Sequence, residues 1–191
     1  MINFIFTGPE SSGKTTLAKK LAMYFNVPLV DEYVRQYFLE KGNTAYTLPD
    51  LKKIAQGQFK SEQSARLTAT LQKKAFYLCD TDLITLKIWS EEVFGVCDEF
   101  IIQGIKKEFI PYTLYPIPKI YFLCSPKDVI WESDPLRENP NDRERLFNIY
   151  LKTLTDLKKQ FIILEGDEEK RFQTALNRMM DYIWTLHNND F

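Results

Sequence analysis

The sequence has few of the residues from which metal centres and disulfides are built. Its single histidine, His187, makes a zinc site unexpected. The cysteines are three in number and form no close pair, and Cys79 and Cys124 lie within apolar runs, which predicts buried free thiols there. No apolar run approaches the ~18 residues of a membrane span, and no basic segment followed by an apolar stretch begins the chain. We therefore expect a cytoplasmic protein with neither a membrane span nor a signal peptide.

The sequence also lacks an excess of charge of either sign. It has 25 Lys and Arg residues against 26 Asp and Glu, a net charge of −1. A neutral chain has no general attraction for the phosphates of nucleic acids or for membrane surfaces. We therefore expect a small-molecule partner and no nucleic acid. The sequence indicates no particular oligomeric state.

The 191 residues are 45% hydrophobic and 14% aromatic, enough for one folded domain with its own core. Short apolar runs predict strands, and apolar residues three and four apart predict helices. The predicted strands are 2–7, 28–30, 75–79, 119–124 and 161–164, and the predicted helices are 14–25, 48–71, 83–93 and 168–186. This alternation predicts a single α/β domain over 1–191, with a parallel five-stranded sheet between layers of helices. Ligands bind beyond the carboxyl ends of the strands in such sheets.

A phosphate-binding loop follows the first predicted strand and opens the first predicted helix. Residues 8–15 fit the pattern G-x-x-x-x-G-K-[ST] without a mismatch. Glycines let the backbone curl so that successive N–H groups converge on phosphate oxygens, and the helix adds its positive end. The chain is thus expected to bind ATP with Mg²⁺, with the lysine on the β- and γ-phosphates. The predicted nucleotide-binding residues are Gly8, Pro9, Glu10, Ser11, Ser12, Gly13, Lys14, Thr15 and Thr16.

Acidic residues follow the second and third predicted strands. Glu32 stands where a carboxylate can accept the proton of an attacking hydroxyl, although a salt-bridged structural acid is the alternative. Asp80 is the predicted partner of Thr15 at the magnesium ion. Asp82 is expected on the same side of the chain as Asp80, free to touch a substrate, and the sequence leaves open which aspartate meets the metal. The D-x-x-G and N-K-x-D motifs of GTPases and the ABC signature are missing.

The charged stretch between the last two predicted strands, about 126–158, has the chemistry of a kinase lid. Arginines on a closing flap offset the charge that spreads over a transferred phosphoryl group. Prolines flank Arg137 and no helical face includes it, so it is a predicted catalytic residue together with Lys14 and Glu32. For Arg143 and Arg145, a solvated helix with Arg/Glu pairs remains an equal alternative.

Four motifs resemble one family in their order and spacing. They are G-P-E-S-S-G-K-T-T, E-Y-x-R (Glu32, Tyr33, Arg35), D-T-D (Asp80 to Asp82) and W-x-x-D-x-L-R (Trp131, Asp134, Leu136, Arg137). Together they resemble the ribosylnicotinamide kinase domain of NadR-type bifunctional NAD-salvage proteins, and stand-alone ATPase/kinases of that group, from Phe4 to about Asp167. The resemblance implies a P-loop nucleoside kinase that converts ATP and nicotinamide riboside into ADP and nicotinamide mononucleotide. No residues precede the first strand, so the adenylyltransferase activity of bifunctional relatives is expected to be absent.

A cationic aromatic substrate of this kind suits stacking on an aromatic face beside a carboxylate. The aromatic candidates are Tyr33, Trp89, Tyr112 and Tyr115; Asp82 could supply the carboxylate, and Arg35 could bind a phosphate, steer the ribose or brace Glu32. The alternatives are a kinase for another nucleoside or a thiamine-like cation, a regulatory ATP-binding module, and a nucleic-acid ATPase, which the net charge disfavours.

Overall fold

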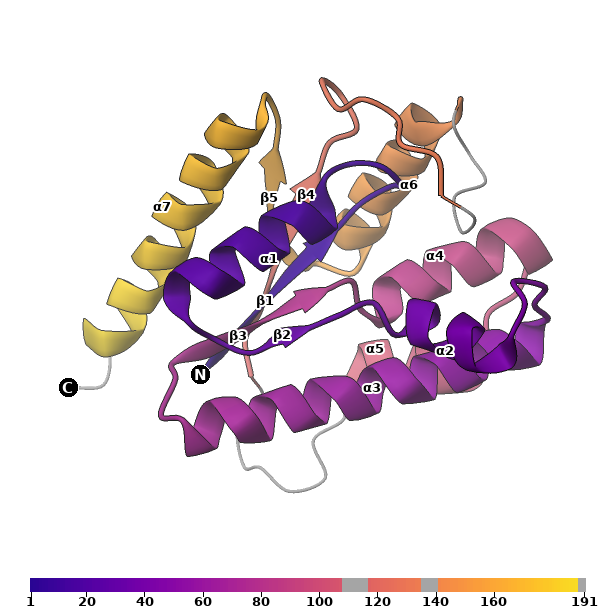
Figure 1. Ribbon diagram of the computed structural model, residues 1–191, viewed down its shortest axis with the longest axis horizontal. Helices are drawn as coiled ribbons and strands as arrows, with labels where there is room; N and C mark the ends of the chain where they lie inside the picture. Colours follow the sequence, from indigo (N-terminus) through magenta and orange to yellow (C-terminus); the bar gives the residue numbers. More distant parts are fainter. Residues whose placement is uncertain (108–116, 135–140, 189–191) are drawn as a thin grey trace.

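The computed structural model describes residues 1–107, 117–134 and 141–188. These residues form five strands, each followed by one or two of seven helices (Figure 1). In chain order they are β1 (Ile2–Thr7), α1 (Lys14–Phe25), β2 (Leu29–Val30), α2 (Tyr33–Lys41), α3 (Leu48–Leu71), β3 (Phe76–Asp80), α4 (Leu83–Phe94), α5 (Glu99–Lys107), β4 (Lys119–Cys124), α6 (Arg143–Asp156), β5 (Gln160–Leu164) and α7 (Glu168–Asn188).

All five strands are parallel and lie in the order β2-β3-β1-β4-β5. The first strand is therefore central, and its six residues are all buried, as a parallel strand covered on both faces requires. Because β3 and β4 flank β1, the loops that follow these three strands meet at one edge of the sheet. This is the edge at which α/β sheets bind ligands.

Two hydrophobic cores cover the two faces of the sheet. Alternate residues of β1 serve opposite cores: Phe4 and Phe6 pack with α1 and α7, whereas Ile5 packs with α2 to α6. Figure 1 shows α1 and α7 side by side, and the rings of Tyr24 and Phe172 pack edge to face with centroids 5.8 Å apart. The predicted three-layer α/β sandwich with a parallel five-stranded sheet is confirmed.

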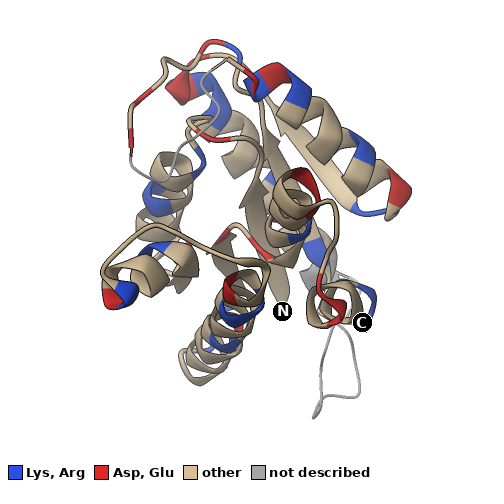
Figure 2. Ribbon diagram, turned by 90° about the vertical axis from the view of Figure 1, so that its right-hand side faces the viewer, with Lys and Arg blue, Asp and Glu red and all other residues tan. Residues whose placement is uncertain are grey.

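Charged side chains lie mainly on the helices and the connecting loops. Figure 2 shows basic and acidic residues interspersed over the molecule, in keeping with the net charge of −1. Within the described part of the chain, each helix is too short or too polar to cross a bilayer.

Candidate active site

The phosphate loop connects the central strand to α1 and has the backbone that its glycines permit. Gly8 has φ 135°, and a Cβ atom there would lie 2.6 Å from the carbonyl oxygen of Cys124 in β4, so a side chain does not fit. Gly13 caps α1 in the left-handed conformation, with φ 79°. The Lys14 ammonium reaches back over the loop and donates to the carbonyl of Pro9 at 2.7 Å.

Two arginines from distant parts of the chain fasten the outside of the loop. Arg171 at the start of α7 is 4% exposed and donates to the carbonyl of Ser12 at 3.0 Å. It also donates to the carbonyls of Ser125 and Lys127, which follow β4, at 2.8 and 2.6 Å. Arg143 donates to the carbonyl of Ser11 at 3.0 Å. Two guanidinium groups therefore hold the backbone of the loop through its carbonyl groups.

The loop forms one wall of a cavity of about 620 Å³, a size typical of small-molecule sites. All nine predicted nucleotide-binding residues, 8–16, line this cavity. Of the other predicted site residues, Glu32, Arg35 and Trp89 line it too. Gly166, in the loop after β5, and Glu168, at the start of α7, line the cavity as well.

Glu32 faces the loop from the start of α2. Its pKa lies above the ordinary value, because burial and the charge of Asp80 outweigh the opposing effect of Lys14 and Arg35. Arg35 Nε lies 3.7 Å from Glu32 Oε2, and Arg35 Nη1 donates to Asp134 at 2.9 Å. Glu32, Lys14 and Asp80 are therefore close enough for their charges to interact. Arg35 forms an ion pair with Glu32, which was one of the three roles that the sequence left open for it.

Thr15 and Asp80 meet as the sequence predicted for a magnesium site. The Thr15 hydroxyl donates to Asp80 Oδ2 at 2.6 Å, and burial raises the pKa of Asp80. The other carboxylate oxygen, Oδ1, is buried and has no hydrogen-bond partner within the described ranges. A hydroxyl beside a carboxylate oxygen that still lacks a partner is a donor set that suits Mg²⁺. These two residues would hold the ion, which would neutralise phosphate charge when bound.

The wall opposite the loop is aromatic. Trp89 in α4 donates from Nε1 to the hydroxyl of Tyr46 at 3.0 Å, and the two rings pack edge to face with centroids 4.8 Å apart. Phe38 and the buried Tyr150 complete this side of the cavity. Tyr46 comes from the loop between α2 and α3, where no periodic pattern or motif marks it in the sequence.

The structure places Asp82 away from the cavity, against expectation. Thr81 has φ 71°, an unusual conformation for a β-branched residue, and it turns the chain so that Asp80 and Asp82 face opposite sides. Asp82 is 2% exposed, caps α4 at the amide of Ile84, and accepts from the hydroxyl of Tyr121 at 2.8 Å. The expectation that it shares a side with Asp80 and is free to touch a substrate is wrong.

Tyr33 also lies elsewhere: its ring packs on α3, where a Cβ at Gly57 would come within 2.0 Å of it. Arg143 serves as a brace of the phosphate loop, and Arg145 lines the cavity with its guanidinium paired to Glu92 and Asp142 at 2.5 and 2.6 Å. The predicted lid of 126–158 includes α6, whose Leu146, Tyr150 and Leu154 are buried. Arg137, Tyr112 and Tyr115 lie outside the described residues.

Sequence reasoning missed the residues that reach the site from afar. These are Phe38, Tyr46, Thr85, Tyr150 and Arg171. None belongs to a local motif, and each is brought to the site by the packing of a separate element. Thr85 and Arg171 lie within predicted helices, but nothing in the sequence marks them as site residues.

A phosphate loop after the central strand, the carboxylate of Asp80 at the end of the neighbouring strand and a cavity lined by the loop and Glu32 define the class of P-loop proteins with a nucleoside kinase-like fold. Comparison with known proteins agrees. The profile of a family described as AAA domain (AAA_28) matches residues 3–171, so this chain belongs to that family.

Two curated relatives are similar in sequence. A cytidylate kinase of Lawsonia intracellularis is 37% identical over 108 residues, which are 54% of this chain and 45% of that protein. The trifunctional NAD biosynthesis/regulator protein NadR of Escherichia coli is 29% identical over 171 residues, 86% of this chain and 38% of that protein. The chain thus spans less than half the length of either relative.

Solved structures share the fold. A NadR protein in complex with NR has a TM-score of 0.69 at 18% identity, over 95% of this chain and 49% of that one. NadR in complex with NAD and AMP-PNP has a TM-score of 0.67 at 16% identity, with the same shares covered. Thymidylate kinase from Ehrlichia chaffeensis has a TM-score of 0.65 at 16% identity, over 93% and 98% of the two chains. The resemblance to the NadR group is confirmed.

Proposed function

We propose that this chain is a small-molecule kinase that transfers the γ-phosphoryl group of ATP to the 5′-hydroxyl of nicotinamide riboside, giving ADP and nicotinamide mononucleotide. One observation carries the proposal: the Glu32 carboxylate lines the same cavity as a phosphate loop, close enough to Lys14 and Asp80 for their charges to act on it. A carboxylate at this place can accept the proton of an attacking hydroxyl. A nucleotide-controlled binding module would have no need of it.

The residues divide the reaction among them. The substrate oxygen forms a bond to the γ-phosphorus while the bond from that phosphorus to the β-γ bridging oxygen breaks, and the hydroxyl proton passes to Glu32. Lys14, released from the carbonyl of Pro9, would follow the charge on the β- and γ-phosphates. The aromatic wall excludes water, so that transfer competes with hydrolysis. Arg137 stays a prediction for the same step.

The choice of nicotinamide riboside is supported by two kinds of observation. The cavity joins aromatic rings to carboxylates of Glu32 and Glu92, a setting that suits a cationic ring. NadR, which is similar in sequence and fold, has been solved with NR bound. The similarity to a cytidylate kinase supports a second candidate, in which the acceptor is a cytidine nucleoside or nucleotide.

A panel of acceptors with ATP and Mg²⁺ tests the proposal. We expect nicotinamide mononucleotide from nicotinamide riboside, with cytidine, cytidine monophosphate, thymidine and thiamine turned over slowly at most. Phosphorylation of another acceptor alone would overturn the choice of substrate.

Glu32→Gln tests the kinase chemistry itself. Removing a general base should lower kcat by about 10² or more while the affinity for ATP stays within about twofold. Glu40→Gln is the matched control, since Glu40 is an exposed glutamate on the same helix. Full turnover in Glu32→Gln would exclude the assigned role.

A further inference from the structure

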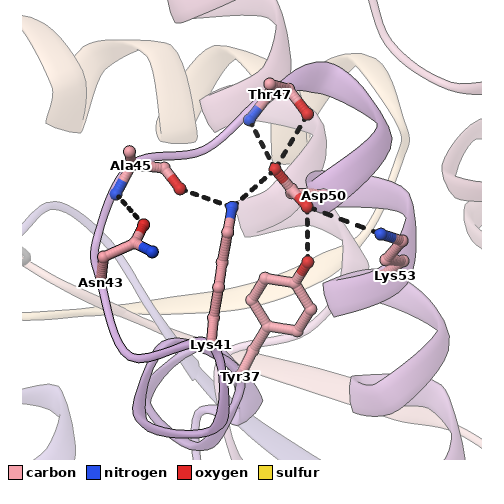
Figure 3. Close-up of polar contacts among 7 residues, drawn as sticks. All are labelled: Tyr37, Lys41, Asn43, Ala45, Thr47, Asp50 and Lys53. Atoms are coloured by element: carbon pink, nitrogen blue, oxygen red, sulfur yellow. Dashed lines mark hydrogen bonds and ion pairs between the residues drawn. The ribbon is translucent and has the colours of Figure 1, made fainter.

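The buried carboxylate of Asp50, at the start of α3, has polar contacts with side chains of α2 (Figure 3). Its side chain is at the start of α3 and forms a capping box with Thr47, accepting from the Thr47 amide at 2.9 Å and from the Thr47 hydroxyl at 2.8 Å. This pair alone would satisfy the helix start. Asp50 accepts more than the cap requires.

Two further donors come from the last turns of α2. The hydroxyl of Tyr37 donates to Asp50 Oδ1 at 2.5 Å, and the ammonium of Lys41 donates to Asp50 Oδ2 at 3.0 Å. Lys41 also donates to the carbonyl of Ala45 at 2.6 Å, within the connecting loop. Asp50 is 6% exposed, so these bonds are largely shielded from water. We call Tyr37, Lys41, Thr47 and Asp50 the Asp50 cluster.

The Asp50 cluster encloses a loop, residues 42–47, that reaches the cavity. Thr44 and Tyr46 of this loop line the cavity, and Tyr46 forms the wall with Trp89. Within the loop, the amide of Ala45 donates to Asn43 Oδ1 at 3.2 Å. The cluster at the base of the loop and the ring contacts of Tyr46 with Trp89 and Phe94 both help to hold it between the two helices.

We propose that Asp50 is a positioning residue that fixes the 42–47 loop, and with it the Tyr46–Trp89 wall, and so sets the affinity of the cavity for the phosphate acceptor. This inference rests on the proposed function. Asp50 does not line the cavity, and it lies on the acceptor side, far along the chain from the phosphate loop. Its effect should therefore fall on acceptor binding and spare the nucleotide.

The test is steady-state kinetics of Asp50→Asn with nicotinamide riboside. The amide keeps the size of the carboxylate but brings N–H donors toward Tyr37 and Lys41, which are donors themselves. We expect KM for nicotinamide riboside to rise about tenfold, the effect of losing hydrogen bonds to a buried charge, with kcat and KM for ATP within about twofold. Tyr37→Phe removes one bond and leaves the capping box intact, so it should raise the same KM about threefold.

Asp98→Asn is the matched control. Asp98 accepts from the amide of Phe100 at 2.8 Å at the start of α5 and pairs with Lys52 at 3.5 Å, so it resembles Asp50 in role. The residues around it, 95–100, do not line the cavity, whereas Thr44 and Tyr46 beside Asp50 do. We expect its kinetic constants to stay at the wild-type values. The proposal would be overturned if Asp50→Asn lowered kcat and raised KM for ATP as much as it raised KM for the acceptor. An unchanged KM for the acceptor would overturn it too.

Amide hydrogen exchange separates this proposal from the proposed function. In Asp50→Asn the amides of residues 44–47 should exchange about tenfold faster than in the wild type, whichever acceptor the enzyme uses. If the wild type phosphorylates no acceptor of the panel, the proposed function fails and exchange alone decides on the cluster. Unchanged exchange in this loop would show that Asp50 does not hold it.

Discussion

The carboxylate of Glu32 is subject to opposing effects from its neighbours. Burial and the nearby Asp80 raise its pKa, and Lys14 and Arg35 lower it without cancelling the rise. A carboxylate that binds its proton more tightly than usual is a better base for a hydroxyl. The same environment makes the charged side chain unfavourable to the folded protein, since the unfolded chain solvates it freely.

The nucleotide-free protein should therefore become more stable when Glu32 loses its charge. Because the folded-state pKa is raised, the cost of the ionised side chain is full above that pKa and disappears as pH falls below the ordinary value of 4.5. We expect Glu32→Gln to raise the free energy of unfolding at pH 7 by on the order of 1 kcal/mol. Chemical denaturation across this pH range measures the gain. Glu40→Gln should show none, and a loss of stability in Glu32→Gln would contradict the argument.

Single residues were predictable where their role depends on their neighbours in the chain. The loop from Gly8 to Thr16 was predictable because its motif directly follows the first strand. The pair Thr15–Asp80 was predictable because Asp80 directly follows the apolar run of the third strand. Tyr46 was not predictable, because its place results from the packing of α2 and α3. The predicted orientation of Asp82 was wrong, because nothing in the sequence D-T-D indicates that Thr81 adopts a left-handed backbone conformation.

At the scale of elements, the strength of the apolar pattern decided what could be predicted. The ranges of β1, α1, α3 and β4 agree with the sequence prediction, and each of these elements has a continuous run or a long stripe of buried residues. The helices α2, α5 and α6 were not among the predicted helices. The helices α2 and α5 have nine residues each, and in α2 only Val34 and Phe38 are buried hydrophobics, too few to show a helical period. The helix α6 lies in the charged stretch that was predicted as a lid, where a solvated helix was an open alternative.

A buried ion pair between α3 and β4 is a second consequence of packing. Lys119 at the start of β4 lies 3.2 Å from Glu62 of α3 and 3.9 Å from Asp82. Glu62 is 7% exposed, and its pKa is raised by burial despite the lysine. Lys119 and Glu62 therefore form a buried ion pair, and the stability of the fold depends on the presence of both charges.

Removing the cation should destabilise the fold severely. Lys119→Met keeps the length of the side chain but leaves two buried carboxylates uncompensated, and we expect a loss of about 3–5 kcal/mol. Thermal and chemical unfolding measure this loss. Lys106→Met, at an exposed position of α5, is the control and should change stability by less than about 0.5 kcal/mol. A similarly small change at Lys119 would contradict the inferred coupling.

For the whole molecule, the strand order brings distant parts of the chain to the phosphate loop. Arg171 donates to carbonyls of Ser12, Ser125, Lys127 and Gly166, so one guanidinium joins the ends of β1, β4 and β5. The sequence predicted the sheet from its alternating elements. It did not predict this junction, because an arginine near a helix start is ordinarily solvated.

Arg171→Lys tests the junction. An ammonium keeps the charge but cannot donate in the planar fork that reaches four carbonyls. We expect affinity for Mg·ATP to fall about tenfold and stability to fall by about 2 kcal/mol. Calorimetric titration and thermal unfolding check this, with Arg178→Lys, at an exposed site of the same helix, as the control. Wild-type affinity in Arg171→Lys would show that the junction does not shape the loop.

The junction also bears on how the protein matures during synthesis. Ser12 and Arg171 are 159 positions apart. On a translating ribosome the phosphate loop emerges long before Arg171, and it lacks this anchor until the start of α7 has left the exit tunnel. ATP should therefore give little help to a nascent chain, and its protection against misfolding should begin only when that late helix docks.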